Sequence, residues 1–267
     1  MKSVIKISEL HLLQPLTAGR LKLKNRVVFP AHQTLLSEEG VIGPRMRAYY
    51  AERARGGVAA VIVEGGAVHD TTIKFPNYLW GHRQEIIPTY IALQKELSHY
   101  GCKTIIQLVH SGSRMSSHDS RLPLWAPSDV RSAISPEIPH VMTIEEIGDV
   151  LDGYEKSFQN AAEAGVDGIE IHAAHEYLLG QFLSPLNNLR NDEYGGSLDN
   201  RMRLLNEVVM LARKTVGDDM IVGIRINGSD LADASLDNDD YIEIAQNIEA
   251  LASIDYLSIS AGTSRDK

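Results

Sequence analysis

Gly165-Val-Asp-Gly-Ile-Glu-Ile171, followed at once by His172-Ala-Ala-His-Glu-Tyr177, is the stretch that decides the fold. Its first part is a mainly apolar run, typical of a buried strand. Its second part brings two imidazoles and a phenol to the point where that strand ends. In parallel α/β proteins, ligands bind at the carboxyl ends of the strands. The stretch therefore predicts a parallel sheet with chemistry at this end.

Short β-branched runs alternate along the chain with longer segments of helical period. This alternation indicates repeated βα units around a parallel sheet. Strands are predicted at 26–29, 59–63, 103–108, 168–171, 221–226 and 256–260. Helices are predicted at 44–55, 143–164, 200–216 and 239–252, and the second opens with the capping-box pattern Thr143-Ile-Glu-Glu146.

The predicted strands number six, whereas a TIM (β/α)8 barrel closes with eight. Residues 260–267 resemble a loop after a sixth strand, and the long segment 110–142 uses up residues that further βα units would need. We expect residues 1–267 to form one TIM-barrel domain that is truncated after its sixth strand, with strands seven and eight missing. Such an arc has two open edges.

The overall charge and composition exclude several classes of protein. A net charge of −9 over 267 residues argues against a general binder of nucleic acid or of anionic membranes. Arg26, Arg114 and Arg225 could still form a local anion site. The single cysteine, Cys102, excludes an internal disulfide and any zinc or iron–sulfur site built from several cysteines of this chain. No apolar run is long enough to span a bilayer and residues 1–10 lack a signal-like core, so we expect a cytoplasmic protein.

Residues 110–142 form a long segment with four prolines and little periodicity. Long loops in compact domains are usually functional insertions or lids. Because this one follows a predicted strand, it should lie on the ligand face. Residues 192–201 are instead interpreted as a polar turn that enters a helix, knitted together by its own charges.

His172, His175 and Tyr177 are the candidate catalytic residues. Imidazoles three positions apart can donate two hydrogen bonds to one oxygen, and Tyr177 could deliver a proton to carbon. Two alternatives stay open: a structural histidine pair, and a zinc or iron site of a barrel hydrolase or lyase. The metal site lacks a clear carboxylate ligand nearby in the sequence.

Gln107 and Arg225 interrupt otherwise apolar strands. A buried amide or cation is costly unless it has a partner, and a heteroaromatic ligand with donors and acceptors would supply one. The alternatives are a hydrogen bond from Gln107 to the backbone and a salt bridge from Arg225 to a carboxylate such as Glu170. Glu64-Gly-Gly66 and Gly112 end strands with residues that allow close approach of a ligand.

Taken together, these residues resemble the old yellow enzyme family of FMN-dependent oxidoreductases. The resemblance runs along essentially the whole chain, and the order and spacing of its pieces are specific. The matching pieces are Pro15-Leu-Thr17 with Leu23-Lys-Asn-Arg26, Val63-Glu-Gly65, Gln107-Leu-Val-His-Ser-Gly112, Ile169 to Leu178, Phe182-Leu-Ser-Pro185, and Asn188 to Gly196 with Asn200-Arg201.

The resemblance implies an eight-stranded barrel that holds FMN at the carboxyl ends of its strands. Pro30, Ala31 and His32 would lie along the flavin, Gly65 and Gln107 would reach its ring system, and Arg225 would sit near its N1/O2 edge. His172 and His175 would hold the oxygen of an electron-poor alkene or carbonyl compound, with Tyr177 as proton donor. NAD(P)H would be the reductant, the partners would be small molecules, and a homo-oligomer is open.

This chain departs from the family's usual pattern at three points. Gln33 stands where many members have cysteine or threonine, and Glu176 stands where the histidine motif usually has glycine. The family's phosphate-binding residues belong to strands seven and eight, so we expect that flavin binding by this chain depends on residues it lacks, and a non-catalytic fragment is a third hypothesis.

Phe29-Pro-Ala-His-Gln33 is similar to the larger branch that includes 2,4-dienoyl-CoA reductase and trimethylamine dehydrogenase. Resemblance to that branch implies a 4Fe-4S cluster and FAD, both only in a longer parent chain.

Overall fold

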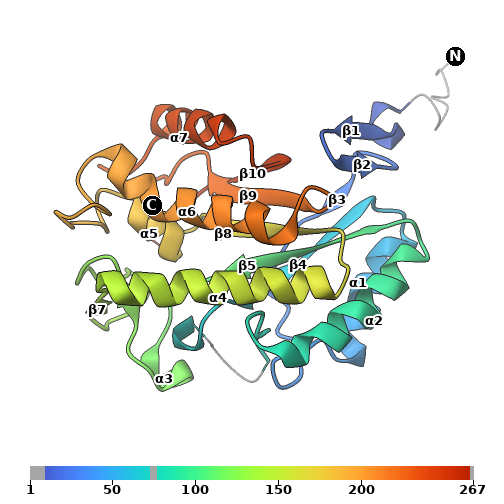
Figure 1. The fold of residues 1–267 in the computed structure, drawn as a ribbon, viewed down its shortest axis with the longest axis horizontal. Helices are drawn as coiled ribbons and strands as arrows, with labels where there is room; N and C mark the ends of the chain where they lie inside the picture. The colour runs from blue at the N-terminus through green and yellow to red at the C-terminus, as the bar shows by residue number, and fades with distance from the viewer. Residues whose placement is uncertain (1–9, 73–76, 265–267) are drawn as a thin grey trace, which may run out of the picture.

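The computed structural model describes residues 10–72 and 77–264 (Figure 1). The strands are β1 (Leu16–Ala18), β2 (Leu21–Leu23), β3 (Val28–Phe29), β4 (Ala60–Ala67), β5 (Lys103–Val109), β6 (Trp125–Ala126), β7 (His140–Val141), β8 (Gly168–Ala173), β9 (Ile221–Asn227) and β10 (Tyr256–Ser260). The helices are α1 (Pro44–Arg55), α2 (Ile87–Ser98), α3 (Ser117–Ser120), α4 (Ile144–Glu163), α5 (Leu178–Leu183), α6 (Leu198–Val216) and α7 (Asn238–Ala250). In the two described ranges no helix is both long and apolar enough to cross a membrane. The predictions for residues 1–9 and 265–267 lie outside these ranges.

One six-stranded parallel sheet organises the molecule, as predicted. Its strand order is β10-β9-β8-β5-β4-β3, and every neighbouring pair is parallel. The two edge strands line opposite sides of one largely apolar cavity of about 320 Å³, with Pro30 beside β3 and Tyr256 in β10 among its walls. The sheet therefore curls as an open part of a (β/α)8 barrel.

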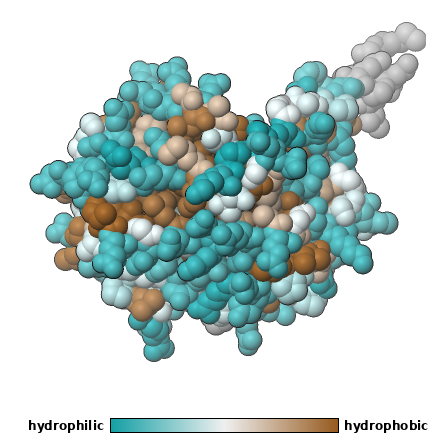
Figure 2. Space-filling view, viewed as in Figure 1, coloured by the Kyte–Doolittle hydropathy of each residue, from teal (hydrophilic) through white to brown (hydrophobic). Residues whose placement is uncertain are grey.

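Helices α1, α2, α4 and α6 lie along the outside of this sheet (Figure 1) and share one hydrophobic core with its outer face. The predicted capping box closes the start of α4, where Thr143 accepts from the N–H of Glu146 and Glu146 accepts from the N–H of Thr143. Figure 2 shows a band of hydrophobic residues at the surface between α4 and α6, beside the core that the two helices share.

Several features of the fold were not predicted, among them the short helix α5 after β8. Helix α2 follows the second predicted strand, and the antiparallel hairpin β1–β2 precedes the first. Leu21 and Leu23 of the hairpin join a separate small cluster inside the sheet. Strand β4 continues to Ala67 through a register shift between Val63 and Gly66, which carries the chain beyond the predicted end of the strand.

Helix α4 approaches the chain after β4 closely at Gly153. A Cβ on Gly153 would lie 2.2 Å from the backbone oxygen of Val68, which cannot move aside as a flexible side chain could. We expect Gly153→Ala to lower the free energy of unfolding by about 1–3 kcal/mol or more. Chemical denaturation monitored by circular dichroism measures this loss.

Gly148 in the same helix is the matched control, since a Cβ there meets no atom within 4 Å. Gly148→Ala should stabilise the protein by roughly 0.5–1 kcal/mol, because alanine loses less backbone entropy in a helix. Equal effects of the two substitutions would contradict the close approach at Gly153.

Candidate active site

A cavity of about 250 Å³ lies at the carboxyl ends of the strands. Its walls contain eight of the nine predicted site residues and three others: Ala31, His32, Gln33, Gly65, Tyr78, Gln107, Val109, His172, His175, Tyr177 and Arg225. The ninth, Pro30, lines the apolar cavity between the edge strands instead. Residues from six separate segments of the sequence therefore converge on one site.

The register of the sheet arranges the inward side chains in two layers. In the lower layer, Gln107 is opposite Glu170, Glu170 is opposite Gly223, and Gly223 is opposite Tyr256. In the upper layer, His172 is opposite Arg225, which is opposite Ser258. Side chains two positions apart on a strand point to the same face, so both layers lie on the inner face of the sheet. The upper layer brings His172 and Arg225 to the cavity, and from the lower layer Gln107 reaches the cavity wall.

The lower layer is a buried hydrogen-bond network around the Glu170 carboxylate. Gln107 Nε2 donates to Glu170 Oε1 at 2.7 Å, and the Tyr256 hydroxyl donates to Oε2 at 2.9 Å. Tyr256 reaches across Gly223, where a Cβ would lie 2.0 Å from the tyrosine ring. Burial raises the pKa of Glu170, and the two hydrogen bonds oppose that rise.

Two predicted alternatives are settled by these contacts. Gln107 bonds to the Glu170 side chain, not to the backbone, and its amide oxygen is left on the side of Gly65 in the cavity wall. Arg225 donates to the hydroxyls of Ser258 at 3.3 Å and Ser260 at 3.2 Å. It makes no ion pair with Glu170, so the predicted salt-bridge alternative is wrong.

The two imidazoles form a directed hydrogen-bond chain. The N–H of Ala174 donates to His172 Nδ1 at 3.2 Å, so in the neutral ring the proton lies on Nε2. That Nε2 is 3.3 Å from His175 Nδ1, which must then accept. His175 therefore carries its proton on Nε2, 2.6 Å from the Ser260 hydroxyl. The donor of His175 is directed at a group that a ligand oxygen can replace.

Tyr177 packs between the imidazoles and a cation. The centroid of the Tyr177 ring is 4.8 Å from the centroid of the His172 ring. The guanidinium carbon of Arg114 lies 5.4 Å from the same Tyr177 centroid. Arg114 also donates to the backbone oxygen of His175. The predicted anion site does not assemble from all three arginines, because Arg26 lines the apolar cavity between the edge strands.

Glu64 holds the loop after β3 against the sheet. Its Oε2 accepts from the N–H of Thr34 at 2.6 Å, and the Tyr50 hydroxyl accepts from the N–H of Glu64 at 3.0 Å. Glu64 Oε1 has no hydrogen-bond partner in the described part of the chain, and burial raises the pKa of this carboxyl. The loop held in this way presents Ala31, His32 and Gln33 to the cavity.

The 110–142 insertion is attached to the sheet by an aromatic stack at one point. Trp125 stacks on His69 with ring centroids 4.8 Å apart, and His110 lies beyond it at 6.5 Å. Burial lowers the pKa of both imidazoles, which favours their neutral forms in the stack. The insertion contains the short helix α3 and the two-stranded sheet of β6 and β7, and is otherwise irregular as predicted.

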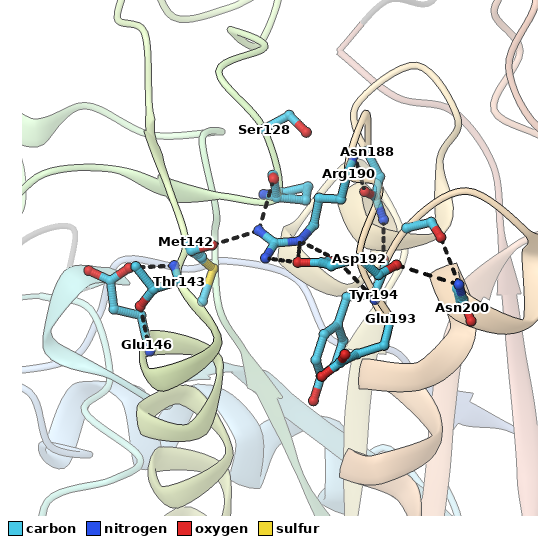
Figure 3. Close-up of polar contacts among 12 residues, drawn as sticks. Ser128, Met142, Thr143, Glu146, Asn188, Arg190, Asp192, Glu193, Tyr194 and Asn200 are labelled. Carbon is cyan, nitrogen blue, oxygen red and sulfur yellow. Dashed lines mark hydrogen bonds and ion pairs between the residues drawn. The ribbon is translucent and has the colours of Figure 1, made fainter.

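Arg190 attaches the other end of the insertion (Figure 3). Its guanidinium donates to the backbone oxygens of Met142 at 2.6 Å and Pro127 at 3.2 Å, while Asp192 holds it by an ion pair of 2.5 Å. Asn188 donates to the backbone oxygen of Tyr194 in the same turn. The structural interpretation of residues 192–201 is confirmed.

Sequence reasoning missed Tyr78 and Val109 as lining residues and treated Gln33 only as a departure from a family pattern. Val109 lies at the end of β5, two positions after Gln107, so the alternation of the strand could have indicated it. Tyr78 lies in a segment without periodicity and gave no signal. For the metal alternative, residues 10–72 and 77–264 contain no group of three or more His, Cys, Asp or Glu that could hold an ion.

Residues 11–261 match the model of the NADH:flavin oxidoreductase / NADH oxidase family. The chain belongs to this family. It is 35% identical over 254 residues to a probable N-methylproline demethylase of Rhizobium meliloti (strain 1021), a match that covers 94% of this chain and 37% of that protein. This family member therefore spans little more than a third of that relative.

Two shorter relatives match over most of their length. An NADPH dehydrogenase of Bacillus pumilus (strain SAFR-032) is 33% identical, with 95% of this family member and 74% of the relative covered. The structure of the old yellow enzyme homologue from Zymomonas mobilis aligns with a TM-score of 0.83 at 26% identity, covering 94% of this chain and 73% of that one. The resemblance to old yellow enzymes is confirmed.

The buried Glu170 predicts a specific pH dependence of stability. Because burial raises its pKa above the ordinary 4.5, the folded protein keeps this proton to a higher pH than the unfolded chain does. From about pH 4.5 upward, the free energy of unfolding should therefore fall as Glu170 is forced to ionise. Glu170→Gln removes this contribution, so the stability difference should move in favour of the variant as the pH rises.

Denaturant unfolding at a series of pH values measures that difference. Glu243→Gln, an exposed change in α7, is the control, and its curve should run parallel to that of the unsubstituted protein. A constant difference between Glu170→Gln and the unsubstituted protein at every pH would contradict the assignment.

Proposed function

We propose that this domain is an FMN-dependent oxidoreductase that uses NAD(P)H to reduce an activated alkene conjugated to a carbonyl or similar group. The observation that carries the proposal is the convergence of His172, His175 and Tyr177 with Gln107 and Arg225 on one cavity at the strand ends. Membership of the flavin oxidoreductase family supports the cofactor. The substrate class rests on the chemistry of the two imidazoles and the phenol.

The groups in the cavity wall suit a flavin ring. Gln107 offers an amide oxygen as acceptor, since its nitrogen is used by Glu170, and Arg225 offers a cation that has no ion-pair partner in the described ranges. A ring system with N–H and C=O groups along one edge complements such a pair. We propose Pro30, Ala31, His32 and Gly65 as further contacts along the flavin. Bound here, FMN would supply hydride taken from NAD(P)H.

His175 would hold the oxygen of the substrate, and His172, whose Nε2 donates to His175 Nδ1, would keep the His175 ring oriented. Each ring carries its proton on Nε2, by the chain of hydrogen bonds from Ala174. A substrate oxygen that replaces the Ser260 hydroxyl would accept from His175 Nε2. The imidazoles would then stabilise the negative charge that forms on this oxygen when hydride reaches the β-carbon. Ligands that bring an acceptor are favoured over ligands that bring a donor.

Tyr177 would complete the reaction by giving its phenolic proton to the α-carbon, so that one hydride and one proton saturate the double bond. Its ring is held against His172, in the same cavity wall. The Arg114 guanidinium packs against this ring and would help to keep it in position, and solvent would return the proton to the phenol afterwards.

Tyr177→Phe tests the proton donor. We expect the oxidative half-reaction with 2-cyclohexenone to slow by about 10²–10⁴-fold, the range for loss of a general acid, with reduction of the flavin by NADPH little changed. Anaerobic stopped-flow absorbance near 450 nm follows both half-reactions. Tyr78→Phe is the matched control, because Tyr78 is the other tyrosine of the cavity wall and has no assigned proton transfer.

Three outcomes would contradict the proposal. The first is flavin that fails to bind under any condition. The second is oxidation of N-methylproline without reduction of enones, which would move this domain to the chemistry named for one of its relatives. The third is a stoichiometric metal ion that is lost in His172→Ala.

A further inference from the structure

Two consecutive residues beside the cavity adopt a left-handed backbone. His175 has φ of 58° and Glu176 has φ of 59°. This conformation costs an L-residue other than glycine about 1–2 kcal/mol, so the surroundings must hold both residues in it. Asn227 Oδ1 accepts from the N–H of His175, and Gln181 Nε2 donates to the backbone oxygen of Glu176 at 2.7 Å.

The side chain of Glu176 is buried, with 3% of its surface exposed, and it contacts two distant loops. Its Oε1 accepts from Asn187 Nδ2 at 3.3 Å. Its Oε2 accepts from the N–H of Ser264 at 3.1 Å and from the Ser264 hydroxyl. The carboxylate therefore ties the chain after β8 to the loop after β10.

Ser264 extends the connection to the insertion. Its hydroxyl donates to Glu176 and accepts from the Ser132 hydroxyl at 3.0 Å and from the N–H of Ala133 at 3.3 Å. Ser132 is itself buried, with 1% exposed. One carboxylate and one hydroxyl thus join three segments: the chain after β8, the loop after β10 and the 110–142 insertion.

The same loop after β10 contacts His175. Ser260, at its beginning, lies 2.6 Å from His175 Nε2, while Ser264, near its end, binds Glu176. The adjacent residues 175 and 176 are therefore held by the two ends of residues 260–264. We expect displacement of one contact to disturb the other, because Ser260 and Ser264 are only four positions apart in the sequence.

We propose that Glu176 is a positioning residue, which acts through Ser264 to hold the 110–142 insertion and residues 260–264 in place and so aligns His175 with the substrate. The consequence for the substrate rests on the proposed function, whereas the structural connection does not. Glycine at 176 would adopt the left-handed conformation without strain but would lose the carboxylate.

Amide hydrogen exchange of Glu176→Gly tests the connection without cofactor or substrate. The N–H groups of Ser264 and Ala133 are backbone donors of this contact. Their exchange should become about tenfold faster or more, because Ser264 loses the carboxylate that accepts from its N–H, and the Ser264 hydroxyl that accepts from Ala133 is no longer held in place. Glu39→Gly is the matched control, an exposed glutamate with φ of 49° outside the site. It makes the same chemical change and should leave both amides unchanged. Ser264→Ala should speed exchange at Ala133 as Glu176→Gly does.

Kinetics of the same variants test the alignment of His175. In Glu176→Gly the KM for the enone should rise about tenfold, as for a small misplacement of a contact group, while flavin reduction by NADPH stays within twofold. Unchanged exchange at both amides would overturn the proposal, and so would faster exchange with an unaltered KM. Absence of all enone reduction in the unsubstituted protein would count against the proposed function alone, because the exchange result stands without it.

Discussion

The parallel register of β5, β8 and β9 is the constraint on which the whole site depends. Strand β8 lies between the other two and is buried along its full length. Its inward positions carry Glu170 and His172, while Ile169 and Ile171 join the core beneath the helices. A slip of one residue would exchange the two sets, burying a carboxylate under α4 and removing the imidazole from the cavity. Because Ile169 and Ile171 must be buried under the helices, Glu170 and His172 are placed on the inner face of the sheet.

The two inner layers divide the work of the site. The lower layer keeps a carboxylate out of water, which is tolerable because two donors satisfy it. Because Glu170 binds the amide nitrogen of Gln107, the amide oxygen of Gln107 remains for a ligand. The upper layer contains the groups that meet the ligand, and its donors are already oriented by Ala174 and Ser260. Orientation achieved before binding reduces the entropy lost when the complex forms.

Local sequence signals were enough for most of the fold and for part of the site. The six strands and the helices α1, α4, α6 and α7 were predicted because β-branched runs, glycines and caps act over a few residues. Helix α2 was missed although its buried positions, such as Tyr90, Leu93 and Leu97, have helical spacing. The hairpin β1–β2 was missed because strands of three residues carry little pattern.

The parts of the site that escaped prediction depend on contacts between distant residues. His172, Gln107 and Arg225 could be found because a polar group at the end of an apolar strand is conspicuous by itself. The role of Glu176 depends on Ser264, which lies 88 residues away in the sequence. Whether Gln107 bonds to backbone or to Glu170, and whether Arg225 pairs with that carboxylate, depended on side-chain geometry. Alternation along one strand cannot supply that geometry.

The close approach of α4 to the backbone at Gly153 has a consequence beyond packing. The backbone that it touches is Val68, and the next residue, His69, supports Trp125 of the insertion. A helix on the outside of the sheet is thus linked through two consecutive residues to the 110–142 insertion. Substitutions along α4 can therefore disturb the insertion without changing any group in the cavity wall, so loss of activity at such positions is no proof of contact with the ligand.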